Sequence, residues 1–124
     1  MNLHSIDAEA LVVLHRQGLI EIGRPVASYD GALLNAALGY PLTHIVSGTA
    51  DVATVAAAYA AGMLKHQPFV SDNLRAAFLA MGLFLYMNDW RLVASQEEAT
   101  AMMRRLSTGD ADEEALADWI RPRL

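Results

Sequence analysis

Cysteine is absent from the 124 residues of this chain. Its absence excludes a disulfide scaffold, a zinc site with thiolate ligands, an iron–sulfur cluster and a thiol nucleophile, and it fits a reducing compartment. Any chemistry must therefore use other side chains.

Basic residues are few. Nine Lys and Arg stand against 14 Asp and Glu, which gives a net charge of -5. That sign is wrong for a protein whose affinity comes from neutralising the phosphates of a nucleic acid. We therefore expect no nucleic-acid partner.

The sequence also shows no pattern typical of a signal peptide or of a membrane-spanning helix. The stretch 1–7 has neither the basic nor the apolar part of a signal peptide. The longest apolar run, residues 76–87, is shorter than the roughly 20 residues that a membrane-spanning helix needs. We expect a cytoplasmic protein with no membrane contact.

Hydrophobic residues are abundant, at 54% of the chain, and only 19% of residues are charged. A chain of this length and composition can bury a core without disulfides or a metal. Apolar residues recur at helical spacing, and we find no alternating strand pattern, repeat or linker. The sequence predicts one all-α domain over 1–124, a compact bundle of about six helices.

Each predicted helix begins at a residue that favours the N-cap and ends near glycine or proline. The first is capped by Ser5 or Asp7 and ends at Ile20 or Ile22, the second runs from Ser28 or Asp30 to Gly39, and the third runs from Thr49 or Asp51 to before Pro68. The fourth covers 72–88 and starts at Ser71 or Asp72, the fifth runs from a capping box at Ser95 to Thr108, and the last runs from Asp110 or Asp112 through Ile120.

Two segments carry more specific expectations. Residues 41–49 hold a β-branched pair beside Ser47-Gly48, and this predicts a short extended flap before the third helix. The helix over 72–88 is apolar nearly all the way round, and this predicts the central, most buried helix.

Histidine-based and nucleotide-binding motifs are mostly excluded. The four histidines show no metal-ligand spacing, and no Walker A, G-x-G-x-x-G or G-x-S-x-G pattern occurs. His15 lies on the apolar face of the first helix, which favours a packing role.

The most informative stretch is residues 65–75, a proline-broken turn that leads directly into the fourth helix. Unpaired N–H groups at that helix start, together with Asn73 and Arg75, would suit a phosphate. The alternative is an ordinary capped helix whose Arg75 pairs with a surface carboxylate.

This stretch resembles the core motif of the Fic/Doc family. Residues 67–77 are similar to H-P-F-x-D-G-N-K-R-T-A of its death-on-curing branch. Leu14-His15 and residues 20–23 resemble its first helix and Tyr-Gly-Gly turn. Residues 29–38 resemble its R-D-x-G-L-L-E-S-A-L segment, and residues 84–90 resemble its F-L-x-x-N-G-Y segment. The resemblance covers nearly the whole chain and implies the family's helical bundle.

The resemblance also implies an activity. Family members transfer AMP, or the γ-phosphate of ATP, to a hydroxyl of a target protein. The expected cofactors are thus ATP and Mg²⁺, and the expected partners are a target with a Ser, Thr or Tyr hydroxyl and an antitoxin protein. In the family a histidine is the general base, an acidic residue holds the metal, and an arginine binds phosphate.

Three motif positions keep their residue types. Phe69 matches the phenylalanine that anchors the loop in the core, Asn73 matches the asparagine, and Arg75 matches the phosphate-binding arginine.

Four motif positions differ. Gln67 stands at the catalytic histidine, Ser71 at the metal carboxylate, Asp72 at the glycine and Leu74 at the lysine. Glutamine cannot accept a proton near neutral pH, neutral serine is a poor Mg²⁺ ligand, and Asp72 places a negative charge where phosphate should approach.

Two neighbours offer substitutes. His66 stands beside Gln67 as an alternative base, and Asp72 is a weak candidate metal ligand. The two would have to shift in opposite directions, because His66 is one position too early and Asp72 one too late. A shift of one position on a helix turns a side chain by about 100°.

Two functions therefore stay open. One is a death-on-curing-like toxin that transfers phosphate or AMP with impaired activity. The other is an inactive Fic/Doc pseudoenzyme that binds or regulates, and this one needs no cofactor.

Overall fold

The computed structural model describes residues 3–124, and in this part of the chain it is all-helical. The prediction of an all-α bundle of about six helices is confirmed. The elements are α1 Ala8–Glu21, α2 Gly31–Gly39, α3 Leu42–Ser47, α4 Val52–His66, α5 Asn73–Met87, α6 Gln96–Thr108, α7 Glu113–Ile120 and the 3₁₀ turn η1 Arg121–Arg123.

Helix starts follow the predicted caps. Where the sequence offered a serine or threonine and an aspartate, the aspartate is the one used, at α1, α2 and α4, and at α7 Asp112 is used rather than Asp110. The side chains of Asp7, Asp30, Asp51 and Asp112 each accept a hydrogen bond from the backbone N–H three residues later. Ser95 forms the predicted capping box at α6. Carboxylates favour these positions because the helix dipole adds to the hydrogen bond.

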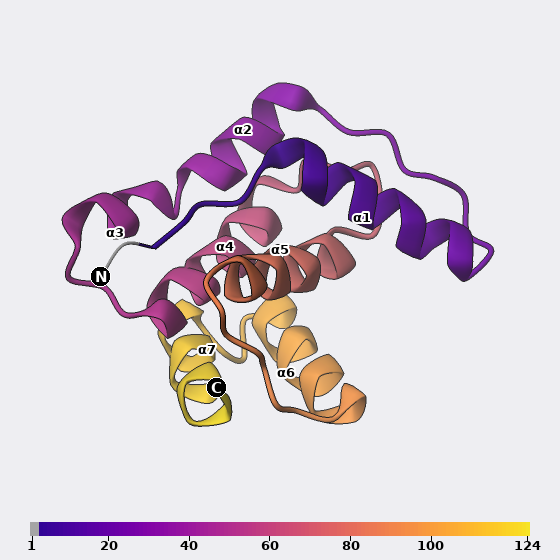
Figure 1. Ribbon diagram of the computed structural model, residues 1–124. Coiled ribbons are helices and arrows are strands. Elements are labelled where there is room, and N and C mark those ends of the chain that lie inside the picture. Colours follow the sequence, from indigo (N-terminus) through magenta and orange to yellow (C-terminus); the bar gives the residue numbers. More distant parts are fainter. Residues whose placement is uncertain (1–2) are drawn as a thin grey trace.

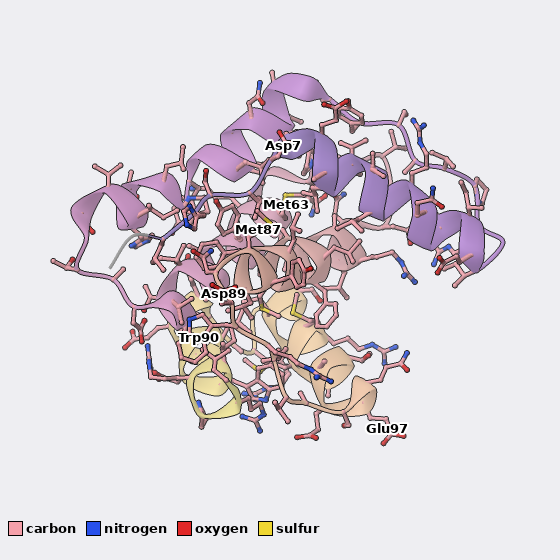
Figure 2. The ribbon with its side chains drawn as sticks, viewed as in Figure 1. Asp7, Met63, Met87, Asp89, Trp90 and Glu97 are labelled. Atoms are coloured by element: carbon pink, nitrogen blue, oxygen red, sulfur yellow. The ribbon has the colours of Figure 1, made fainter. Side chains whose placement is uncertain are left out.

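The helices form three tiers (Figure 1). α1, α2 and α3 lie on one side, α4 and α5 run through the middle, and α6 and α7 lie on the other side. The turn after α5 carries Asp89 and Trp90 (Figure 2), and Asp89 there has a left-handed backbone with φ 64°. None of the helices in residues 3–124 has the length and apolar character to cross a bilayer.

The central helix is α4, so the prediction that gave this place to 72–88 is wrong. Ten residues of α4 are buried, compared with six residues of α5. In addition, α4 packs against α2, α3, α5 and α7. Small side chains explain the difference, because they let neighbouring backbones approach closely. A Cβ added at Gly62 would lie 2.6 Å from the carbonyl oxygen of Ala37 in α2. On α5, by contrast, Phe78 and Tyr86 are exposed.

The predicted flap at 41–49 is also wrong, because Leu42–Ser47 is the helix α3. Pro41 precedes its first turn, and Gly48 ends it with φ 70°. This is the usual preference for proline at a helix start and glycine at its end, and it overrides the β-branched pair. The extended segment lies elsewhere, before α2, where Tyr29 forms an isolated antiparallel bridge with Phe69.

Candidate functional site

The residues of the family-like motif lie in the connection between α4 and α5. We call residues 67–72 the loop, and residues 24–30, which join α1 to α2, the strap. The strap runs antiparallel to the loop, and two backbone hydrogen bonds join them. The N–H of Val70 donates to the carbonyl of Ser28, and the N–H of Asp30 donates to that of Pro68, both at 2.9 Å. The loop is therefore built into the fold by a segment distant in sequence.

Phe69 anchors the loop, as predicted. Its side chain is only 4% exposed. Its ring centroid lies 4.0 Å from that of His15 in α1 and 5.7 Å from that of Tyr29 in the strap. The loop is thus pinned between α1 and the strap by aromatic packing.

Asn73 holds the loop from the other side. Its amide oxygen accepts the N–H of Phe69 at 3.0 Å, and its amide nitrogen donates to the carbonyl of Phe69 at 2.8 Å. Both ends of the amide are therefore used to fix the backbone around Phe69. Leu74, at the family's lysine position, packs partly buried against the core.

Asp72 stands at the start of α5 with a left-handed backbone, φ 61°. Its carboxylate does not cap the helix. Instead one oxygen accepts from the Arg24 guanidinium at 2.8 Å, and the other accepts from the Ser71 hydroxyl at 3.1 Å. Only 9% of the Asp72 side chain is exposed. The negative charge at the helix start is thus neutralised by the strap.

His15 is a packing histidine, as predicted, and it also has a link that the sequence did not reveal. Its Nε2 donates to the backbone carbonyl of Asp72 at 3.1 Å, since a carbonyl can only accept. Burial lowers the pKa of His15, although the bond to Asp72 and the charge of Asp72 oppose that shift. Nearby Arg75 lowers the pKa further. The neutral ring therefore joins α1 to the first residue before α5.

Arg75 does not form the surface ion pair of the alternative interpretation. Among residues 3–124 it has no carboxylate within ion-pair distance, and its Nε is buried with no hydrogen-bond acceptor. Its guanidinium lies against α1, because a Cβ added at Gly18 would be 3.7 Å from its Nη1. A buried donor without an acceptor costs free energy. Arg75 is therefore a cation beside this helix start that no carboxylate of residues 3–124 neutralises.

Gln67 and His66 stand slightly apart from these contacts. Gln67 is exposed and ends α4 in a left-handed conformation, φ 44°, and its N–H donates to the carbonyl of Met63. His66 is the last residue of α4 and is half-buried. In the described chain neither side chain takes part in the hydrogen bond between Ser71 and Asp72 or in those between Asn73 and Phe69.

A cleft of about 340 Å³ lies between α1 and the strap, with Phe69 at its base. Aromatic and aliphatic groups form most of its wall, and Arg16 adds one cation. The lining residues are Val12, His15, Arg16, Val26, Ala27, Ser28, Tyr29 and Phe69. The strap is therefore one wall of the cleft.

The donor set does not fit Mg²⁺. Magnesium prefers carboxylate and phosphate oxygens in near-octahedral geometry. Over residues 3–124 no group of three or more His, Asp or Glu side chains converges, and the Asp72 carboxylate is bound by Arg24 and Ser71. The Asp72 carboxylate is therefore not available as a Mg²⁺ ligand in this arrangement.

The sequence matches no protein-family model, and no curated protein matches it.

Proposed function

We propose that this chain is a Fic/Doc-like domain of the death-on-curing branch that works as a binding or regulatory module without transferring phosphate or AMP. One observation carries the loss of transfer: the carboxylate of Asp72 occupies the helix start where the family's loop admits phosphate, and Arg24 holds it there at 2.8 Å.

Backbone geometry supports the family assignment. Among non-glycine residues a left-handed backbone is uncommon. Asp72 and Asp89 both have one, with φ 61° and 64°. Both stand where the family pattern has glycine, in D-G-N-K-R and in F-L-x-x-N-G-Y. The chain thus keeps the turns that those glycines would form, and aspartate tolerates them better than most residues.

The charges at the loop support the loss of transfer. Phosphate binding at a helix start depends on free N–H groups and a positive field. Here the Asp72 carboxylate stands at that start. The side-chain amide of Asn73 is already hydrogen-bonded to the backbone of Phe69. Gln67 supplies no base. Base, metal ligand and phosphate cradle are separate requirements of the transfer, and each is altered.

A second candidate is an active transferase of a toxin–antitoxin module, and Arg75 favours it. A guanidinium with a buried, unsatisfied Nε beside a helix start suits a nucleotide phosphate. This function would require ATP, Mg²⁺, a protein hydroxyl as acceptor and His66 as base, with an antitoxin as partner. We place it second because Asp72 opposes the anion that Arg75 attracts.

A label-transfer assay separates the two functions. ATP labelled at the α- or the γ-phosphate is incubated with the protein and a lysate, with and without Mg²⁺. We expect no transfer by the natural sequence, and none by Gln67→His alone, because restoring one requirement leaves the others missing. The combination Gln67→His, Ser71→Asp, Asp72→Gly and Leu74→Lys is expected to transfer label and to slow growth when expressed without an antitoxin.

The control is His66→Ala in the natural sequence. If the natural protein transfers label and His66→Ala abolishes the transfer, the proposal is wrong and the second candidate is right. Circular dichroism of each variant verifies that the helices are intact.

A further inference from the structure

The strap is fastened to the loop at three points. Going along the strap, Arg24 meets Asp72, Ser28 meets Val70 and Asp30 meets Pro68. The last two contacts are backbone hydrogen bonds on either side of buried Phe69. The first is an ion pair, and it is the one attachment of the three that depends on charge.

The ion pair is exposed on one side only. The Asp72 side chain is 9% exposed, whereas that of Arg24 is 54% exposed. Asp72 is also held by two other residues. The Ser71 hydroxyl donates to its carboxylate, and His15 donates to its backbone carbonyl. Dissolved ions therefore reach the arginine side, and salt screens an exposed pair of this kind.

Few apolar contacts hold the strap besides the packing of Tyr29 on Phe69 and of Ala27 on the core. Val26 and Tyr29 are 47% and 46% exposed, so apolar burial along the strap is small. Gly23, just before Arg24, has φ 72°, a conformation that gives the chain a sharp turn where the strap leaves α1. Segments with few buried apolar contacts open most readily.

We propose that the Arg24–Asp72 ion pair is a salt-sensitive latch that keeps the strap closed on the loop and so controls the opening of the cleft between the strap and α1. When the pair breaks, the strap keeps its two hydrogen bonds around Phe69 and the packing of Tyr29 on the Phe69 ring. The cleft widens when these contacts open, because Val26 and Tyr29 line it from the strap. The latch depends on contacts within the chain itself and does not rest on the proposed function.

Amide hydrogen exchange measured by NMR tests the latch. The N–H groups of Asp30 and Val70 make the two strap–loop bonds, so their exchange rates report strap opening. We expect Arg24→Gln to speed both by about two- to five-fold, the change that loss of a partly exposed ion pair gives. Asp72→Asn should do the same, since asparagine tolerates the left-handed backbone. The double variant should be no faster than either single one.

Two control variants and a salt series show whether the charge of Arg24 is responsible for the change in exchange rate. Arg91→Gln removes the same charge from an exposed residue that forms no ion pair within residues 3–124, and it should leave both rates unchanged. Arg24→Lys should keep most of the protection. Salt raised from about 0.01 M to about 1 M shortens the screening length from roughly 30 Å to roughly 3 Å, and it should speed exchange in the natural protein but not in Arg24→Gln.

The latch is refuted if Arg24→Gln leaves the two rates unchanged, if Arg91→Gln raises them equally, or if salt acts alike on the natural protein and on Arg24→Gln. Urea unfolding of each variant distinguishes local opening from a global loss of stability, which would speed every protected amide. None of these readouts involves nucleotide or transfer, so the latch and the proposed function fail separately.

Discussion

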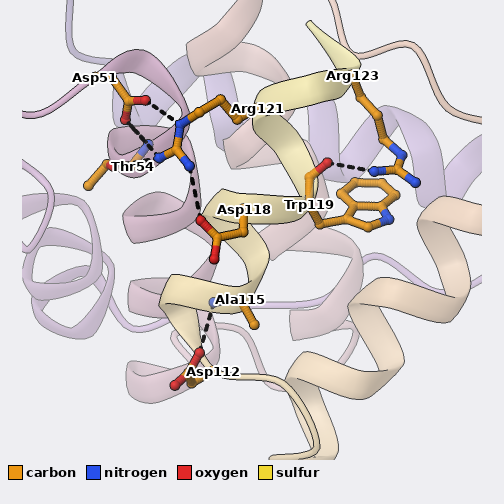
Figure 3. A network of polar contacts seen from close by, with 8 residues as sticks. All are labelled: Asp51, Thr54, Asp112, Ala115, Asp118, Trp119, Arg121 and Arg123. Carbon is orange, nitrogen blue, oxygen red and sulfur yellow. Dashed lines mark hydrogen bonds and ion pairs between the residues drawn. The ribbon is translucent and has the colours of Figure 1, made fainter.

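Two aspartate–arginine pairs flank α4 along the chain, one at Asp51 just before the helix and one at Asp72 after the loop, and they are built differently. At the start of α4, Asp51 caps the helix and binds the Arg121 guanidinium at 2.6 and 3.3 Å (Figure 3), and Arg121 also binds Asp118. After the other end, Asp72 caps nothing and holds Arg24 through a single contact.

The difference shows what each pair does. The Asp51 pair ties the C-terminal turn to the central helix and satisfies its donors and acceptors together. Arg121 holds the pKa of the Asp51 carboxyl well below its usual range. The Asp72 pair closes a short segment over a loop, next to Arg75 with its unsatisfied Nε. The Asp51 pair therefore joins α4 to the C-terminal turn, whereas the Asp72 pair joins the strap to the loop.

The largest loss of stability should come from removing Phe69, the apolar anchor of the loop. Phe69→Ala deletes a buried ring that contacts His15 and Tyr29 and should lower the free energy of unfolding by roughly 3–5 kcal/mol. Urea denaturation measures it. A loss under about 1 kcal/mol would mean that the ring is not part of the core.

The next largest loss of stability should come from the Asp51–Arg121 pair at the start of α4. Asp51→Ala removes a cap and an ion pair and should cost roughly 1–2 kcal/mol, most of it from the cap. Arg121→Gln leaves the cap and removes only the exposed pair, so it should cost clearly less than Asp51→Ala. Equal losses in the two variants would contradict this division.

A pH dependence should come from His15. Its pKa is lowered in the folded protein, so the unfolded chain binds a proton at higher pH than the folded one does. Stability should therefore be full above about pH 6.5 and fall as the pH drops below that value toward the folded pKa. Urea midpoints measured through this range should fall more in the natural protein than in His15→Gln. Parallel curves would show that His15 is not the group responsible.

The smallest change in stability should come from Asp72, the last residue of the loop. Asp72→Gly removes the pair with Arg24, but it also relieves the left-handed backbone at φ 61°, which glycine adopts without strain. The two changes oppose each other, so stability should change by less than about 1 kcal/mol. Nucleotide binding, measured by calorimetry, should tighten because a repelling charge is gone. Unchanged or weaker binding would count against an anion site beside Arg75.

Local features of this chain could be read from the sequence because each depends on neighbouring residues. The caps at Asp7, Asp30, Asp51 and Asp112 and the capping box at Ser95 need only a side chain and the N–H group three residues on. The burial of Phe69 followed from its place in the motif. Helical periodicity and the lack of alternation were enough for the all-α class.

Tertiary structure alone decided the rest. Small residues gave no signal that α4 is central, because an alanine-rich face is equally compatible with burial and exposure until a neighbouring backbone packs against it. The extended segment lies at the strap and not at 41–49, because its partner is a loop far along the chain. For the same reason the spacing of residues could not show that Arg24 binds Asp72, that His15 binds the same residue, or that the Nε of Arg75 is left without an acceptor. Those contacts exist only once α1 is packed against α5, and no local pattern encodes that packing.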